Sequence, residues 1–134
     1  MNYIFEILLF AFTIFSESSG EGVIGMQATA NVISNRVYSK YYPDDYYSVV
    51  FQPFQFSCFN NEAHISRNLG RIWKNEREFT SFIESLVIAI KTHHRTNCID
   101  TTDGAIYYMT LDTHKKWTND LTFIKNIGNH KFYK

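Results

Sequence analysis

Cysteine is scarce in this chain, and neither sign of charge is in excess. The two cysteines, Cys58 and Cys98, lack the short spacing of a zinc or redox motif, so neither kind of site is predicted. They could form one bridge, although scarce cysteine in a chain of this size favours free thiols. Thirteen basic residues balance thirteen acidic ones. We therefore predict no metal or cofactor, and the charge gives no support to nucleic acid or an anionic membrane as a partner.

A long apolar run is also missing. The most apolar stretch covers residues 3–15 and is interrupted by Glu6. A helix that spans a bilayer needs about 20 residues, so we predict no stable membrane insertion. The stretch could instead mimic a secretory signal, but the residues before it carry no Lys or Arg and the cleavage site after it is poor. A cleaved signal is thus the less favoured alternative, and we expect a buried first helix of the domain.

Length and hydrophobic periodicity bound the fold. A chain of 134 residues fits one compact domain, residues 1–134, which can bury one core without disulfides or metals. Apolar spacing predicts helices at residues 3–17, 22–38 and 77–93, with a loop and a short helix in 57–75. Strand patterns follow at 105–110, 123–127 and 131–133, the last two joined by a Gly-Asn turn. Helices first and a small antiparallel sheet last predict an α+β fold.

Two carboxylates follow the first predicted helix. In the segment FSESSGEG, residues 15–22, Glu17 ends the apolar helix and Glu21 opens the next one. Burial and the negative pole of a helix C-terminus both raise the pKa of a carboxyl group, whereas a helix N-terminus favours its ionised form. Glycosidases obtain a general acid at neutral pH from such a separation of pKa values. Taken alone, the pair is more typical of a solvated helix end and an ordinary first-turn acid.

The same segment opens a set of sequence blocks that resembles the SleB-type cell-wall hydrolases, the family of spore cortex-lytic catalytic domains also found in phage lysins. Members read as an apolar helix, then Ala-Glu-Ala-x-Gly-Glu, then a helix that ends in Asn-Arg-Val. The blocks here are FSESSGEG with GMQATANVISNRV (15–22 and 25–37), VVFQPFQFSCF (49–59), DGAIYY (103–108) and, after Trp117, IGNHKFY (127–133). Each block alone is weak, but their order over nearly the whole chain is specific.

Three features depart from the family pattern. Ser18 and Ser19 replace the commoner Ala-Arg, and residues 60–76 match poorly. Met109 stands where relatives often carry His or another polar residue. No role is therefore carried over to the side chain at position 109.

The resemblance implies a lysozyme-like helical core and a lytic transglycosylase that cuts peptidoglycan glycan strands. Glu17 is the expected catalytic acid and base, which closes a 1,6-anhydro ring on N-acetylmuramic acid. Glu21, Gln55 and Ser57 are expected to support it. A glycan groove needs flat apolar faces and amide partners, and the residues expected to bind sugars are Tyr107, Tyr108, Trp117, Asn129, His130 and Tyr133.

Other interpretations stay open. A hydrolytic muramidase of the phage endolysin type would follow if Glu21 took part in catalysis. The fold could also survive as an inactive glycan-binding module, or the chain could be a secreted or membrane-active helper. The aromatic candidates could equally pack in a core, and Asn35 and Arg36 are expected to hold a helix end. We expect a monomer that acts on the bacterial cell wall by an unknown export route, a phage-encoded cytoplasmic lysin included.

Overall fold

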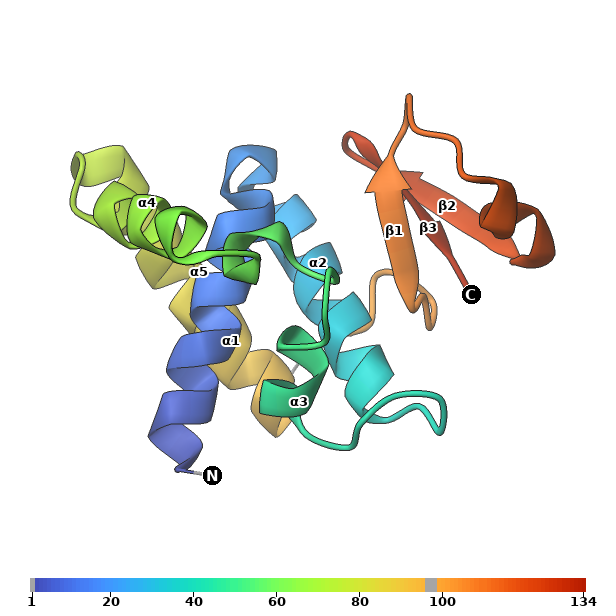
Figure 1. Ribbon diagram of the computed structural model, residues 1–134, viewed down its shortest axis with the longest axis horizontal. Helices are drawn as coiled ribbons and strands as arrows, with labels where there is room; N and C mark the ends of the chain where they lie inside the picture. The colour runs from blue at the N-terminus through green and yellow to red at the C-terminus, as the bar shows by residue number, and fades with distance from the viewer. Residues whose placement is uncertain (1, 96–98) are drawn as a thin grey trace.

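The computed structural model describes residues 2–95 and 99–134. Its helices are α1 (Tyr3–Ser18), α2 (Gly22–Val37), α3 (Tyr46–Val50), α4 (Glu62–Ile72) and α5 (Glu76–His94), and its strands are β1 (Tyr107–Thr110), β2 (Phe123–Ile127) and β3 (His130–Tyr133). Short 3-10 turns lie between them: η1 (Ser19–Glu21), η2 (Ser57–Phe59) and η3 (Lys116–Asp120). The other helices gather on one side of α2 and the sheet on the other (Figure 1). The predicted α+β order is confirmed.

α1 forms the centre of the larger core because nearly all of its faces are apolar. Phe10, Ile14 and Phe15 are fully buried, and α1 packs against α2, α3 and α5. Burying one such side chain contributes about 1.5–3 kcal/mol, so packing rather than intrinsic propensity holds this helix. The expected buried first helix is confirmed, and it ends one residue beyond the predicted boundary.

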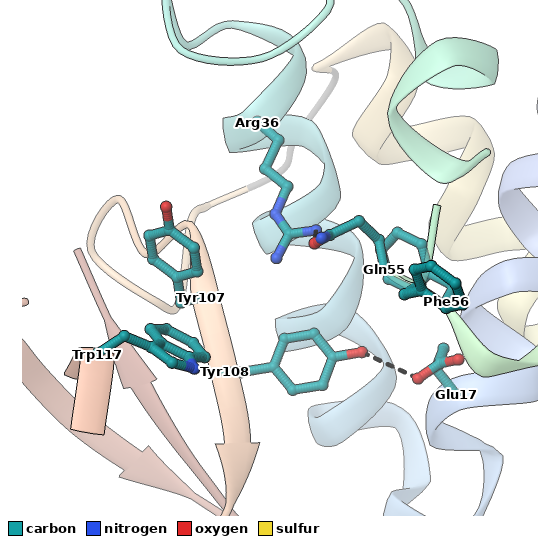
Figure 2. A pocket seen from close by; sticks show the side chains of 8 residues that line it. Glu17, Arg36, Gln55, Phe56, Tyr107, Tyr108 and Trp117 are labelled. Carbon is teal, nitrogen blue, oxygen red and sulfur yellow. Dashed lines mark hydrogen bonds between the residues drawn. The ribbon is translucent and has the colours of Figure 1, made fainter. Parts of the chain in front are cut away.

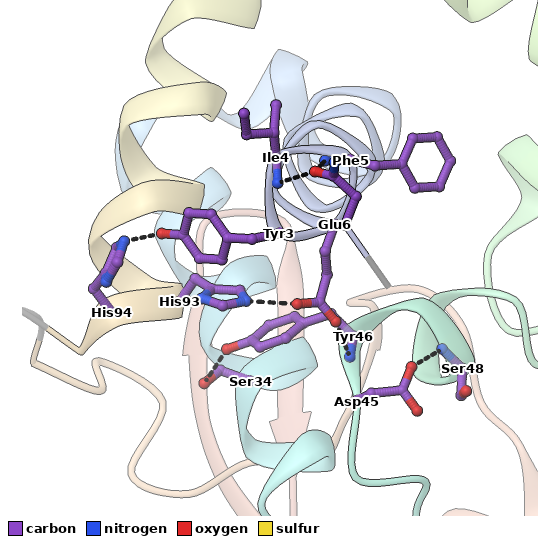
Figure 3. Close-up of polar contacts among 11 residues, drawn as sticks. Tyr3, Ile4, Phe5, Glu6, Ser34, Asp45, Tyr46, Ser48, His93 and His94 are labelled. Carbon is purple, nitrogen blue, oxygen red and sulfur yellow. Dashed lines mark hydrogen bonds and ion pairs between the residues drawn. The ribbon is translucent and has the colours of Figure 1, made fainter.

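Glu6, the polar interruption of this apolar helix, contacts two other helices directly and a third through Tyr46 (Figure 3). Its carboxylate lies 2.8 Å from Nε2 of His93 in α5 and accepts a hydrogen bond from the backbone N–H of Tyr46 in α3 at 3.2 Å. Tyr46 stacks on the His93 ring and donates its hydroxyl to Ser34 of α2. Glu6 therefore helps to fix the direction of α1 relative to the rest of the core.

α2 lies between two packed clusters. Met26 and Ile33 face the helical core. Ala28 and Val32, on another side of the same helix, pack against Phe132 of the sheet. α2 therefore fixes the distance between the end of α1 and the first strand.

The sheet is antiparallel in the order β1-β3-β2. Tyr107 of β1 lies opposite Tyr133 of β3. Gly128, in the turn from β2 to β3, has a φ of 56°, a region that glycine adopts without strain. The predicted hairpin is confirmed, while β1 is shorter than the predicted strand because residues 105 and 106 belong to the preceding loop.

The sequence pattern does not predict α3. Its five residues are too few to show a helical period. The helix is instead held by its N-cap, where Asp45 accepts the backbone N–H of Ser48 at 2.7 Å, and by the burial of Val49 and Val50.

The helical stretch Tyr3–Val37 is long and apolar enough to cross a membrane by length and composition, and 44% of its most apolar window is buried inside the protein. The core helix of a soluble protein meets the same criterion. The absence of stable membrane insertion stays a prediction.

Candidate active site

A cavity of about 510 Å³ opens where the end of α1, the loop before η2, α2 and β1 meet (Figure 2). This volume lies within the range of ordinary ligand sites, about 300–1,000 Å³. Its walls are mainly aromatic, with one carboxylate and one guanidinium. The lining residues are Glu17, Arg36, Phe54, Gln55, Phe56, Tyr107, Tyr108 and Trp117.

Glu17 reaches the cavity from the last turn of α1. The next residue, Ser18, is buried, and its hydroxyl donates to the carbonyl of Ile14 at 2.9 Å. The hydroxyl of Tyr108 donates to Oε2 of Glu17 at 3.3 Å, which points the carboxylate across the cavity toward β1 (Figure 2). A helix end and a strand far apart in sequence therefore fix this carboxylate together.

Burial raises the pKa of Glu17 above its ordinary value. Four features oppose burial and favour the ionised form: the Tyr108 hydroxyl, the backbone N–H groups of Ser57 and Cys58, and the charge of Arg36. The net direction is upward, as expected from the apolar helix in the sequence. The same groups that oppose burial are placed to stabilise the carboxylate once the proton has left.

Two neighbours of Glu17 keep their own protons. Burial, with the nearby charge of Glu17, raises the pKa of Cys58 to about 12 and that of Tyr108 well above its ordinary value. Tyr108 is therefore a permanent donor, and the Cys58 thiol is not nucleophilic at neutral pH. The prediction that Cys58 and Cys98 are free thiols stays a prediction, because Cys98 lies outside the described residues.

Arg36 forms a wall of the cavity rather than only a helix end, which differs from the sequence expectation. The residue is 5% exposed. Its Nε–H donates to the carbonyl of Ile106 at 2.8 Å, and Nη1 donates to Oε1 of Gln55 at 3.1 Å. Arg36 follows Val32 by one turn on the sheet-facing side of α2. An arginine on this apolar side of the helix was the sequence signal that could have indicated its role.

Glu21 is not among the residues that line the cavity and instead binds the turn between β2 and β3. Its carboxylate accepts from the backbone N–H and from Nδ2 of Asn129, both at 3.3 Å, and lies 3.8 Å from Nδ1 of His130. A Cβ on Gly128 would lie 2.8 Å from Oε2 of Glu21, so the turn closely approaches this side chain. Glu21 therefore ties the start of α2 to the sheet.

The predicted site residues thus fall into two groups. Glu17, Gln55, Tyr107, Tyr108 and Trp117 line the cavity, and the backbone of Ser57 reaches Glu17. The rings of Tyr107 and Trp117 lie 5.5 Å apart, side by side on one wall.

The second group lies elsewhere. Asn129 and His130 contact Glu21, and Tyr133 is buried against Phe123 in the sheet. None of these three lines the cavity, because the motif IGNHKFY forms the β2–β3 turn and β3.

Sequence reasoning missed Phe54 and Phe56 as well as Arg36. Phe54 is 90% exposed with a φ of 62°, and Phe56 lies under the Arg36 guanidinium. Both aromatic residues flank Gln55 in the block VVFQPFQFSCF, which was the signal available. Among residues 2–95 and 99–134, no three His, Cys, Asp or Glu side chains are grouped to hold a metal ion.

Comparison with known proteins gives consistent matches. The family model described as Cell Wall Hydrolase matches residues 20–133. Spore cortex-lytic enzymes of Bacillus cereus and Oceanobacillus iheyensis are 33% and 32% identical to this chain over 130 residues, 96% of its length. The chain spans only 44% and 41% of those two relatives.

Two solved structures share the fold. The catalytic domain of the germination-specific lytic transglycosylase SleB from Bacillus anthracis matches with a TM-score of 0.67 and 31% identity, covering 96% of this chain and 93% of that one. The catalytic domain of the Bacillus cereus SleB protein matches with a TM-score of 0.66 and 32% identity, covering 96% and 89%. The resemblance seen in the sequence blocks is confirmed.

Proposed function

Because this chain belongs to the cell wall hydrolase family, we propose that it degrades peptidoglycan by cutting the bond between N-acetylmuramic acid and N-acetylglucosamine. The observation that carries this proposal is the placement of Glu17. It is a buried carboxyl with a raised pKa, held by Tyr108 in an aromatic cavity. A carboxyl that keeps its proton in such a site can act as a general acid near neutral pH. The relatives in the comparison carry spore cortex-lytic and lytic transglycosylase names, which agree with this chemistry.

In the proposed reaction, Glu17 donates its proton to the oxygen that links the two sugars. Positive charge develops at the anomeric carbon of the muramic acid, and that sugar's 2-acetamido group can stabilise it. The ionised Glu17 then removes the proton of the same sugar's 6-hydroxyl. That oxygen attacks the anomeric carbon and closes a 1,6-anhydro ring, which leaves Glu17 protonated for the next cycle.

The number of carboxylates favours this route over hydrolysis. Hydrolytic glycosidases pair two carboxyl groups across the scissile bond. Among the described residues that line the cavity, Glu17 is the one carboxylate, and Glu21 is bound to the β2–β3 turn. An attacking hydroxyl supplied by the substrate itself needs no second carboxylate to activate water.

The remaining wall residues suit a glycan. Tyr107 and Trp117 offer flat faces on which a sugar ring can stack, and Gln55 offers an amide for hydroxyl or acetamido groups. We propose that the protein works as a monomer at the bacterial cell wall and that Tyr107, Tyr108, Trp117 and Gln55 bind the strand.

The Glu17→Gln variant tests the assignment. It should abolish lysis of purified sacculi, because positioned acid–base catalysis contributes about 10²–10⁴-fold and a glutamine cannot donate this proton. Glu62→Gln, an exposed first-turn acid of α4, is the matched control and should lyse at the wild-type rate. Circular dichroism shows whether both variants fold. Full lytic activity in folded Glu17→Gln would refute the assignment.

Mass spectrometry of the digested glycan separates the two chemistries. The proposed route yields products that end in 1,6-anhydro-N-acetylmuramic acid. Products with one added water would instead identify a muramidase, and sacculus binding without soluble products would identify an inactive glycan-binding module.

A further inference from the structure

Arg36 is a buried cation whose charge has no close carboxylate partner. Among the described residues, no carboxylate oxygen lies within 4.0 Å of its guanidinium. A buried charge is costly unless it is paired or hydrogen-bonded. The protein retains this charge at the wall of the cavity, 5% exposed.

The hydrogen bonds of Arg36 leave part of the guanidinium unused. Nε and Nη1 donate to Ile106 and Gln55, respectively. Nη2 donates to no atom of the residues described by the structure. Figure 2 shows the guanidinium directed from α2 into the space bounded by Tyr107, Tyr108 and Gln55. The unused donors therefore face the cavity that also holds Glu17.

Aromatic rings surround the cation without neutralising it. The guanidinium carbon lies 5.1 Å from the ring centre of Tyr42, 5.6 Å from that of Phe56 and 5.8 Å from that of Tyr107. Such rings stabilise a cation through their negative faces. Because Arg36 is only 5% exposed, an anion that reaches it would be weakly screened.

We propose that Arg36 binds a carboxylate on the muramic acid side of the glycan, and that this contact distinguishes muramic acid strands from neutral polymers of N-acetylglucosamine. Muramic acid differs from N-acetylglucosamine by its 3-O-lactyl group. The carboxylate can be that of the lactyl group when it is free, or a carboxylate of the attached peptide. The inference rests on the proposed glycan substrate and adds a specificity residue to it.

Binding of an anion at Arg36 would also act on Glu17. The charge of Arg36 favours the ionised form of Glu17 and lowers its pKa. A bound carboxylate offsets that charge, so Glu17 holds its proton more firmly in the complex than in the free protein. A strand with the correct substituent thus brings the acid into its donating state.

The first experiment measures binding of defined sugars to the wild-type protein by calorimetry. One pair is the disaccharide N-acetylglucosaminyl-N-acetylmuramic acid and its methyl ester, which tests the lactyl carboxylate. The other is the same disaccharide carrying L-Ala-D-isoglutamine and its amide, which tests a peptide carboxylate. We expect neutralisation to weaken binding about 10- to 100-fold in at least one pair, as for hydrogen bonds to charged groups. Equal affinities within both pairs would overturn the proposal.

The second experiment asks whether Arg36 is the group that reads the charge. Arg36→Gln should lose the preference for acid over neutral sugar, measured as the ratio of the two affinities in the same variant. Arg36→Lys should restore part of the preference, because it keeps the charge but not the planar fork. Arg67→Gln, at an exposed position of α4, is the matched control and should keep the full preference. A folded Arg36→Gln that still prefers the acid would refute the role.

If Arg36→Gln does not fold, the salt dependence of binding to the wild-type protein still tests whether a charge on the sugar is recognised. Rising ionic strength should weaken binding of the acid and leave the ester unchanged, and an identical salt response would refute the proposal. Failure of the proposed function would give a different result: the protein would release no product from sacculi but would still prefer the charged sugar. Activity on sacculi without any charge preference would remove this inference alone.

Discussion

Gly25→Ala would place a methyl group against the side chain that ties α2 to the sheet. A Cβ at position 25 would lie 2.2 Å from Cβ of Glu21 and 3.3 Å from its Cγ. Rotating the far end of Glu21 cannot relieve a clash at its Cβ, so the backbone of η1 must move. Such a shift would pull the Glu21 carboxylate from its two hydrogen bonds with Asn129.

The expected cost combines three contributions. Overpacking by one methyl group costs about 1–3 kcal/mol. Alanine in place of a helical glycine returns roughly 0.5–1 kcal/mol. Loss of the Asn129 hydrogen bonds adds about 1 kcal/mol, the low end of the usual range, because both are long and Asn129 is exposed. We therefore expect the free energy of unfolding to fall by about 1–3.5 kcal/mol.

Denaturant unfolding of the variant, followed by circular dichroism, measures this change. Gly70→Ala is the matched control, since Gly70 also lies in a helix and a Cβ there would meet nothing within 4 Å. The control should gain up to about 1 kcal/mol from propensity alone. If Gly25→Ala proved as stable as Gly70→Ala, the close approach of Glu21 to Gly25 would be wrong, and with it the account of how the sheet is held.

Two further predictions concern Glu17. Tyr108→Phe removes a hydroxyl that lowers the pKa of Glu17, so the high-pH limb of lysis should move to higher pH while the maximal rate falls about 10-fold, as for loss of a hydrogen bond to a charged group. A pH–rate profile on sacculi checks this, with Tyr47→Phe at an exposed position of α3 as the control. An unmoved limb would contradict the prediction. Because burial raises the folded-state pKa of Glu17 above the ordinary value of 4.5, the contribution of Glu17 to the stability of the wild type should fall as pH rises through that raised pKa. Denaturant unfolding should thus show that Glu17→Gln gains stability relative to the wild type at pH 8 but not at pH 4. An equal difference in the free energy of unfolding at both pH values would exclude a buried ionised carboxylate.

Much of the fold could be predicted because local sequence patterns indicate most of its helices and strands. α1 is apolar on nearly every face, which indicates a central helix, and β2 and β3 flank a glycine turn. α3 could not be found, because a helix of five residues is defined by its cap and its burial rather than by a period. Glu6 could be seen to interrupt the apolar run, but its partners, Tyr46 and His93, come from helices distant in sequence.

The candidate site was accessible to sequence reasoning only in part. Glu17 stands out as a carboxyl at the end of an apolar helix, and Tyr107, Tyr108 and Trp117 stand out as aromatics in family motifs. The role of Arg36 could not be predicted, because its hydrogen-bond partners, Gln55 and Ile106, are distant in sequence and only the fold brings them together. Proximity in a motif was also misleading, because Asn129 and His130 contact Glu21 rather than the cavity.

The segment FSESSGEG now has a physical explanation. Residues four apart on one continuous helix share a face, so an unbroken helix would aim Glu17 and Glu21 at the same space. The chain instead breaks at η1, and Gly22 adopts φ 72° and ψ −175°, a conformation essentially restricted to glycine. As a result, Glu21 binds the sheet, whereas Glu17 lines the cavity. The break at η1, together with Gly22, therefore keeps the second carboxylate out of the site, which supports chemistry by a single acid and an attacking hydroxyl from the substrate.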